Sequence, residues 1–100
     1  MAQQQTQQQP ARQRLPRIAI LALAESTASV VYGMYDLFRC AGRDWGLIVA
    51  GAPGEALVDP VVVARARGLL VAGNGVPIDA QAALADALDA DVVCVPDLLV

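Results

Sequence analysis

Hydrophobic and polar positions change their spacing within residues 17–42, and the change predicts a strand followed by a helix. The apolar run Ile18–Leu23 has no polar member, which is typical of a strand buried on both faces of a parallel sheet. After the polar turn 24–27, apolar residues recur at three- and four-residue spacing, as on one face of a helix: Val31, Met34, Tyr35, Phe38 and Ala41. We expect Ser26 or Thr27 to cap this helix with its side chain, and Gly42 to end it.

Downstream, shorter apolar runs predict more strands and one more helix. We expect strands over Trp45–Ala50, over 58–67 with Pro60 marking a sheet edge and Arg65 and Arg67 on a wet face, over 69–72, and over 92–95. A helix is expected over 80–87, with Asp79 as its N-cap. The pattern therefore predicts the α/β class with a parallel sheet. Because a doubly wound sheet needs helices on both faces, we expect residues 16–100 to be the N-terminal part of a larger domain.

Residues 1–15 have a different composition, rich in glutamine, and we expect them to form a disordered leader. The whole chain is 56% hydrophobic and 17% charged, which suits a folded core. The net charge of −3 argues against nucleic-acid contact by this segment. No signal peptide or membrane-spanning run is present, so a cytoplasmic protein without membrane contact is expected.

In parallel sheets, ligands bind at the carboxyl ends of the strands, which places the candidate ligand-binding residues in the loops that follow them. These residues are Glu25, Ser26 and Thr27, with Asn74 and Asp97 as secondary candidates. The segment Gly73-Asn74-Gly75 resembles the start of a dinucleotide fingerprint, but Ile78 replaces the third glycine, so we interpret it as a turn. A phosphoacceptor receiver domain is disfavoured because the chain has no lysine.

Histidine is absent, which excludes histidine-based triads and histidine metal ligands within this chain. Cys40 and Cys94 have no neighbours that would activate a thiol, so we interpret them as small buried hydrophobic residues in the reduced state. Tyr32 and Tyr35 are assigned to the core or to a dimer surface. We therefore predict no catalytic residue, no metal site and no cofactor in this chain.

Four segments together resemble the amino-terminal part of a PfpI-like domain, in the class I glutamine amidotransferase-like superfamily. They are RIAILAL (17–23), YDLFRCAG (35–42), NGVPIDAQAAL (74–84) and DADVVCVPD (89–97). The likeness is strongest to the sensor domains of AraC-type transcriptional regulators. It implies a flavodoxin-like parallel-sheet sandwich, often dimeric, here incomplete. In the enzymatic branch, a cysteine elbow would follow Val100, and the assisting acid would stand where this chain has Val30. The proline exit of the strand over 92–95 usually continues with glycines, whereas here Pro96 is followed by Asp97.

The resemblance implies a non-catalytic module, or a fragment of a transcriptional regulator, that senses a ligand or dimerises. The expected partners are a small-molecule effector and a second copy of the chain. The alternative is a fragment of a cysteine-dependent hydrolase or deglycase whose nucleophile lies beyond residue 100. A third hypothesis is a truncated product without a function of its own, prone to pair edge to edge.

Overall fold

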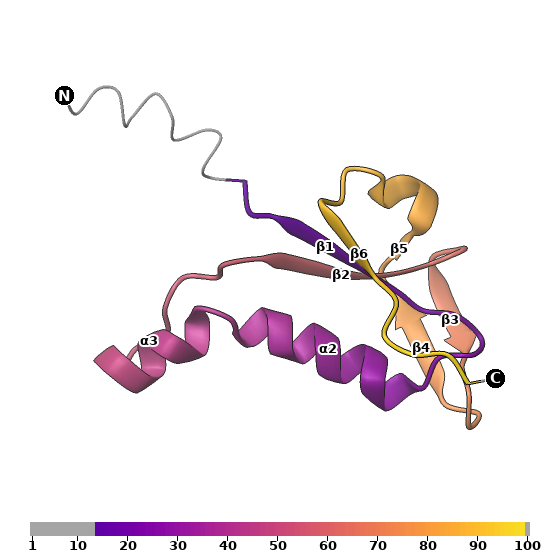
Figure 1. Cartoon of the computed structure of the whole chain (residues 1–100), viewed down its shortest axis with the longest axis horizontal. Helices are drawn as coiled ribbons and strands as arrows, with labels where there is room; N and C mark the ends of the chain where they lie inside the picture. The colour runs from indigo at the N-terminus through magenta and orange to yellow at the C-terminus, as the bar shows by residue number, and fades with distance from the viewer. Residues whose placement is uncertain (1–13, 100) are drawn as a thin grey trace.

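The computed structural model describes residues 14–99, which form a mixed α/β fold (Figure 1). Most of the predicted leader lies outside the described residues. Its last two residues, Arg14 and Leu15, adjoin the folded part, and Arg14 donates a hydrogen bond to the Asp89 carbonyl at 3.0 Å. In chain order, the elements are β1 (Arg17–Leu21), α2 (Ala28–Cys40), α3 (Arg43–Ala50), β2 (Asp59–Ala64), β3 (Gly68–Val71), β4 (Pro77–Ala80), β5 (Ala82–Ala83), the 3-10 helix η1 (Leu84–Ala87) and β6 (Val92–Cys94).

A parallel sheet forms the centre of the described part, with strand order β5-β2-β1-β6. The predicted α/β class and parallel sheet are confirmed. β1 lies between β2 and β6, and its Ile20 pairs with Val62 on one side and Cys94 on the other. β3 and β4 pair separately as an antiparallel hairpin.

Alternate residues of β1 and β2 face opposite sides of the sheet, and each side has its own core. Ile18, Ile20 and Val62 pack with Val31 of α2. Ala19, Val61 and Val63 pack with Ala87 of η1 on the other side. Figure 1 shows α2 along one side of the strands and η1 on the opposite side. Helix α2, in the connection from β1 to β2, and η1, in the connection from β5 to β6, therefore cover opposite faces of the sheet.

The predicted first helix is present as α2, and its apolar stripe is inside as expected. Val31 is fully buried, and Met34, Tyr35 and Phe38 pack against the same core. Gly42 follows the C-cap Ala41 with φ of 82°, as predicted for the residue that ends the helix. The predicted N-cap is only partly right. Thr27 occupies the N-cap position, but neither it nor Ser26 caps the first turn with its side chain.

The strand predicted over Trp45–Ala50 is wrong, because Arg43–Ala50 forms helix α3. A short apolar run does not distinguish a strand from a helix by periodicity alone. Gly42 and Gly51 have positive φ at the two ends of α3, and Gly51 is its left-handed C-cap. These two glycines are the local signal that favours the helix.

The helix predicted over 80–87 and the strand predicted through 65–67 are also wrong. Ala80 ends β4 and Ala82–Ala83 form β5, so only Leu84–Ala87 is helical, as a 3-10 turn. Strand pairing overrides the helix propensity of the alanines, because Ala82 and Ala83 pair with Val63 and Ala64. Asp79 consequently lies within β4 and is not an N-cap. Residues 65–67 form a bend before Gly68, whose φ is 112°.

Pro60 lies in β2, an interior strand of the sheet, whereas the sequence predicted an edge strand. A proline is tolerated there because β5 pairs with only the end of β2. Gln81 makes the hydrogen bonds to Val62 of β2 that a longer β5 strand would make. The Val62 N–H donates to Gln81 Oε1 at 2.8 Å, and the Gln81 N–H donates to the Val62 carbonyl at 2.8 Å. Pro60 is two residues away, so its missing N–H would point to the same side, where β5 does not reach.

The last predicted strand is present as β6, but it is not buried as expected. Val92 and Val93 are about half exposed, at 50% and 52%. β6 is an edge strand that pairs with β1 alone among the described residues. The covering elements α2 and η1 pack on β1 and β2, so they leave β6 open.

Candidate functional site

Three loops meet at the carboxyl edge of the sheet, where the parallel strands end. We call them the loop junction: residues 22–27 after β1, 72–76 in the β3–β4 hairpin, and 95–99 after β6. The Gly73 N–H donates to the Ser26 carbonyl at 2.7 Å, and the Leu99 N–H donates to the Glu25 carbonyl at 2.6 Å. A parallel bridge also joins Thr27 to Gly73. A Cβ at position 73 would lie 3.0 Å from the Ser26 carbonyl oxygen and would displace the Leu99 side chain, so glycine lets the hairpin approach the loop after β1 closely.

Asp97 ties the loop after β6 to the start of α2. Its Oδ1 accepts the Thr27 N–H at 3.2 Å, and its Oδ2 accepts the Thr27 hydroxyl at 2.7 Å. A carboxylate at the N-terminus of a helix also interacts favourably with the helix dipole. Asp97 therefore holds the N-cap residue Thr27 in place, whereas the predicted side-chain cap on the first turn of α2 is not formed.

Ser26 has a structural place in the loop junction. It is fully buried, its Oγ accepts the Leu23 N–H at 3.0 Å, and its own N–H donates to the Leu23 carbonyl at 3.0 Å. These bonds close the turn after β1. A ligand on the surface would not reach the Ser26 hydroxyl, so this residue acts through the shape of the loop.

Glu25 and Asn74 present exposed side chains at the loop junction. Asn74 has φ of 66° and Gly75 has φ of 78°, so the segment 73–75 is a turn, as the sequence indicated. The structure therefore brings all five predicted site residues to one edge of the sheet. Glu25 and Asn74 are exposed, Thr27 and Asp97 are half-buried, and Ser26 is buried.

A hollow of about 420 Å³ opens at this edge, between the ends of β1 and β2. We call it the carboxyl-edge cleft, and its lining residues are Ala22, Leu23, Ala24, Ala64, Arg65, Ala66, Leu69 and Leu70. Sequence reasoning missed it because residues 65–67 were assigned to a strand. The rule that pointed to residues 25–27 after the first strand points equally to Arg65 after the second, once the end of β2 is known.

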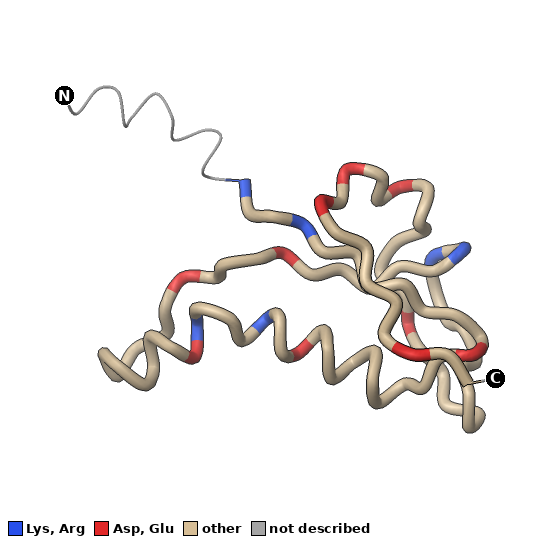
Figure 2. Tube along the Cα trace, viewed as in Figure 1, with Lys and Arg blue, Asp and Glu red and all other residues tan. Residues whose placement is uncertain are grey.

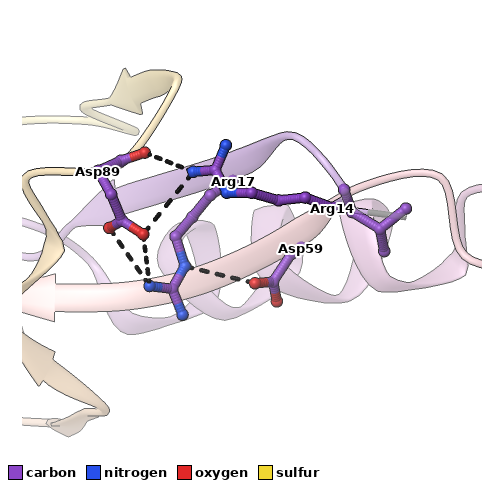
Figure 3. A pocket seen from close by; sticks show the side chains of 5 residues that line it. Arg14, Arg17, Asp59 and Asp89 are labelled. Atoms are coloured by element: carbon purple, nitrogen blue, oxygen red, sulfur yellow. Dashed lines mark hydrogen bonds and ion pairs between the residues drawn. The ribbon is translucent and has the colours of Figure 1, made fainter. Parts of the chain in front are cut away.

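The opposite edge of the sheet holds a cluster of charged side chains that neutralise one another (Figure 3). Arg17 Nε lies 3.3 Å from Asp59 Oδ2, and Arg17 Nη1 lies 3.4 Å from Asp89 Oδ1. Arg14 Nη2 forms a further ion pair with Asp89 at 3.7 Å, and the Arg17 N–H donates to Asp91 Oδ2 at 2.7 Å. Arg17 thus links the starts of β1 and β2 to the segment before β6. We interpret this cluster as structural.

Both cysteines are free and half-buried, not fully buried as the sequence suggested. Arg43 Nη2 donates to Cys40 Sγ at 3.0 Å, and Asp44 lies next to this pair. Hydrogen bonding to the Asp44 carboxylate, followed by desolvation, raises the pKa of the Cys40 thiol. A thiol with a raised pKa is a poor nucleophile at neutral pH. Cys94 lies in β6, on the edge of the sheet.

Within residues 14–99, no group of three or more histidine, cysteine, aspartate or glutamate side chains is arranged to hold a metal ion. The helices of this part are also too short or too polar to cross a membrane. Comparisons of the chain with family models, with curated proteins and with solved structures found no match. The PfpI-like resemblance therefore stays a prediction.

Proposed function

We propose that this chain is a non-catalytic, ligand-sensing module with a PfpI-like, flavodoxin-like fold, of the kind that serves a transcriptional regulator. The observation that carries the proposal is the loop junction at the point where the strand order reverses. The chain passes from β1 to β2 on one side, and then crosses to β6 on the other. A flavodoxin-like sheet begins with this order, and its ligands bind where the connections diverge.

The loop junction also connects a ligand site to the body of the fold. Thr27 is the N-cap of α2, and its N–H and hydroxyl both bond to Asp97. A ligand that contacts the exposed Glu25 or Asn74 would shift the turn on which α2 begins. Because α2 covers one face of the sheet, such a shift would reach the packed core. This connection is the physical basis for sensing.

The hydrolase or deglycase alternative gains no specific support from the described residues. The hydrogen bond to Asp44 raises the pKa of the Cys40 thiol, which opposes thiolate formation. Cys40 also ends α2, whereas the loop junction adjoins the beginning of that helix. A nucleophile is expected near the edge where ligands bind, so Cys40 is in the wrong place for that role.

The proposed sensing function predicts that some small molecules stabilise the chain through the loop junction. We expect compounds from a mixed set of small acids, amines, sugars and aromatic molecules to raise the midpoint of thermal unfolding, because a ligand that binds only the folded state stabilises it. Glu25→Gln and Thr27→Val should weaken that effect. Ser29→Ala, an exposed position in the first turn of α2, serves as the matched control. Equal stabilisation of all variants would rule out the loop junction as the site.

A second copy of the chain is the partner that we propose for α3. Figure 1 shows α3 at the end of the molecule away from the β3–β4 hairpin. Three of its apolar side chains are more than half exposed: Trp45 at 66%, Ile48 at 76% and Val49 at 58%. Exposed aromatic and aliphatic side chains gathered on one helix are typical of an interaction surface. Self-association would cover them.

Light-scattering mass measurement tests this partner. We expect a particle of twice the chain mass of 10.4 kDa, and we expect Ile48→Asp to convert it to the monomer. Leu88→Asp is the control, because Leu88 is 80% exposed but lies after η1, away from α3. A monomeric wild-type chain would contradict the proposal, as would equal effects of the two variants.

A further inference from the structure

A second hollow adjoins the carboxyl-edge cleft. We call it the leucine groove, and it has a volume of about 460 Å³ and is lined by Leu21, Leu23, Arg65, Leu84, Ala85 and Leu88. Leu23 and Arg65 line both hollows. The two spaces therefore lie on either side of this pair of residues. Together they offer a largely apolar surface with a single charged side chain.

Arg65 has no counter-charge within the described part of the chain. Among residues 14–99, ion pairs are formed by Arg14, Arg17 and Arg43, whereas Arg39, Arg65 and Arg67 have no carboxylate within 4.0 Å, and of these three only Arg65 lines the two hollows. Its side chain is exposed and stands directly after β2. Figure 2 shows this basic segment in the bend between β2 and β3. A guanidinium group is always charged and binds a carboxylate through two parallel hydrogen bonds.

The remaining lining is suited to an aliphatic or aromatic body. Leu21, Leu23, Leu84 and Leu88 face the leucine groove, and Leu69 and Leu70 face the carboxyl-edge cleft. Both hollows are open to solvent, and Leu69 and Leu88 are 77% and 80% exposed, so they offer a ligand uncovered apolar surface and enclose it only in part. Burying apolar ligand surface against these leucines would contribute most of the affinity, while Arg65 would orient the charged end.

We propose that Arg65 and the leucine groove bind a small amphipathic carboxylate, a single-charged acid with an alkyl or aryl body. The inference rests on the proposed sensing function and places a ligand beside the loop junction, because Leu23 belongs to both the loop junction and the leucine groove. Glu25 and Asp97 lie at this edge as well, and the chain has a net charge of −3. These negative charges disfavour ligands with several anionic groups, so a monocarboxylate fits better than a polyphosphate.

Chemical-shift mapping of the ¹⁵N-labelled full chain with octanoate tests this ligand class. We expect octanoate to shift the amides of residues 21–24, 64–66 and 84–88. Octanol has the same tail without the charge, and octylammonium has the opposite charge. Both should bind roughly two- to fivefold more weakly, because Arg65 is exposed and an exposed ion pair stabilises only modestly. Arg65→Gln should weaken octanoate binding by a similar factor. Arg67→Gln is the matched control, because Arg67 lies in the same bend but lines neither hollow.

The salt dependence provides a second measurement that does not rely on a variant. Binding of octanoate should weaken as ionic strength rises, because an exposed charge pair is screened. Octanol that binds as tightly as octanoate would overturn the carboxylate assignment. If octanoate leaves these amides unchanged while other compounds of the mixed set bind at the loop junction, the ligand class is wrong and the sensing function stands. If no compound perturbs this edge, both are wrong.

Discussion

Ile20→Ala is expected to lower the free energy of unfolding by about 2–5 kcal/mol, the largest effect of any substitution considered for this chain. Ile20 is fully buried in β1, the strand that pairs on both sides with parallel neighbours. Its side chain packs in the core beneath α2. Removing three carbon atoms there loses apolar burial and leaves a cavity that the paired strands cannot collapse to fill.

Urea denaturation followed by circular dichroism measures this effect. Leu37→Ala is the control, because it also removes three carbon atoms, at a position that is 71% exposed on α2 and lies outside the proposed self-association surface. Since alanine is also the better helix former, the control should leave stability within about 0.5 kcal/mol of the wild type. Similar losses for Ile20→Ala and Leu37→Ala would mean that β1 is not the centre of the core.

Gly46→Ala and Gly33→Ala are expected to change stability in opposite directions, although both glycines lie inside helices. A Cβ at Gly46 would overlap the backbone of Gly54, in the loop that packs against α3. We expect a loss of about 1–3 kcal/mol, because backbone atoms would have to move apart. A Cβ at Gly33 meets nothing within 4 Å. Alanine there should stabilise α2 by about 0.5–1 kcal/mol.

The midpoints of thermal unfolding of the two variants, measured side by side, test this prediction. The intrinsic helix propensity favours alanine at both positions, so the difference between the two isolates the contact between Gly46 and Gly54. Stabilisation by Gly46→Ala would contradict the described packing of α3 on the loop 52–57. Destabilisation by Gly33→Ala would contradict the open space that a Cβ meets on that face of α2.

The strand β1 and the helix α2 followed from the sequence because their signals are local and agree with one another. The uninterrupted apolar run of 18–23, the stripe from Val31 to Phe38 and the positive-φ residue Gly42 each favour this strand and helix. The segment 80–83 was assigned wrongly because its structure depends on distant partners. Its alanines are strong helix formers, but pairing with Gly68 and with Val63–Ala64 holds Ala80, Ala82 and Ala83 in strands.

For the candidate site too, the sequence predicted what depends on local signals and missed what depends on contacts between distant residues. The carboxyl-edge rule placed Glu25, Ser26, Thr27, Asn74 and Asp97 in strand-end loops, and the structure brings those loops together. The rule could not say that the Thr27 hydroxyl bonds to Asp97, because 70 residues separate them. Nor could it identify Arg65, because that requires knowing where β2 ends. The burial of Ser26 is likewise a property of the assembled turn.

Chemical-shift mapping with the mixed compound set tests the central claim most directly, because it locates binding without assuming a ligand. We predict that at least one compound perturbs amides of the loop junction and the carboxyl-edge cleft, and leaves those around Arg17 and Asp59 unchanged. Either of two results would contradict this prediction. The first is binding at the opposite edge of the sheet, or in the hollow of about 330 Å³ that Tyr32, Tyr35 and Gln81 help to line. The second is that no compound perturbs the amides at the carboxyl edge.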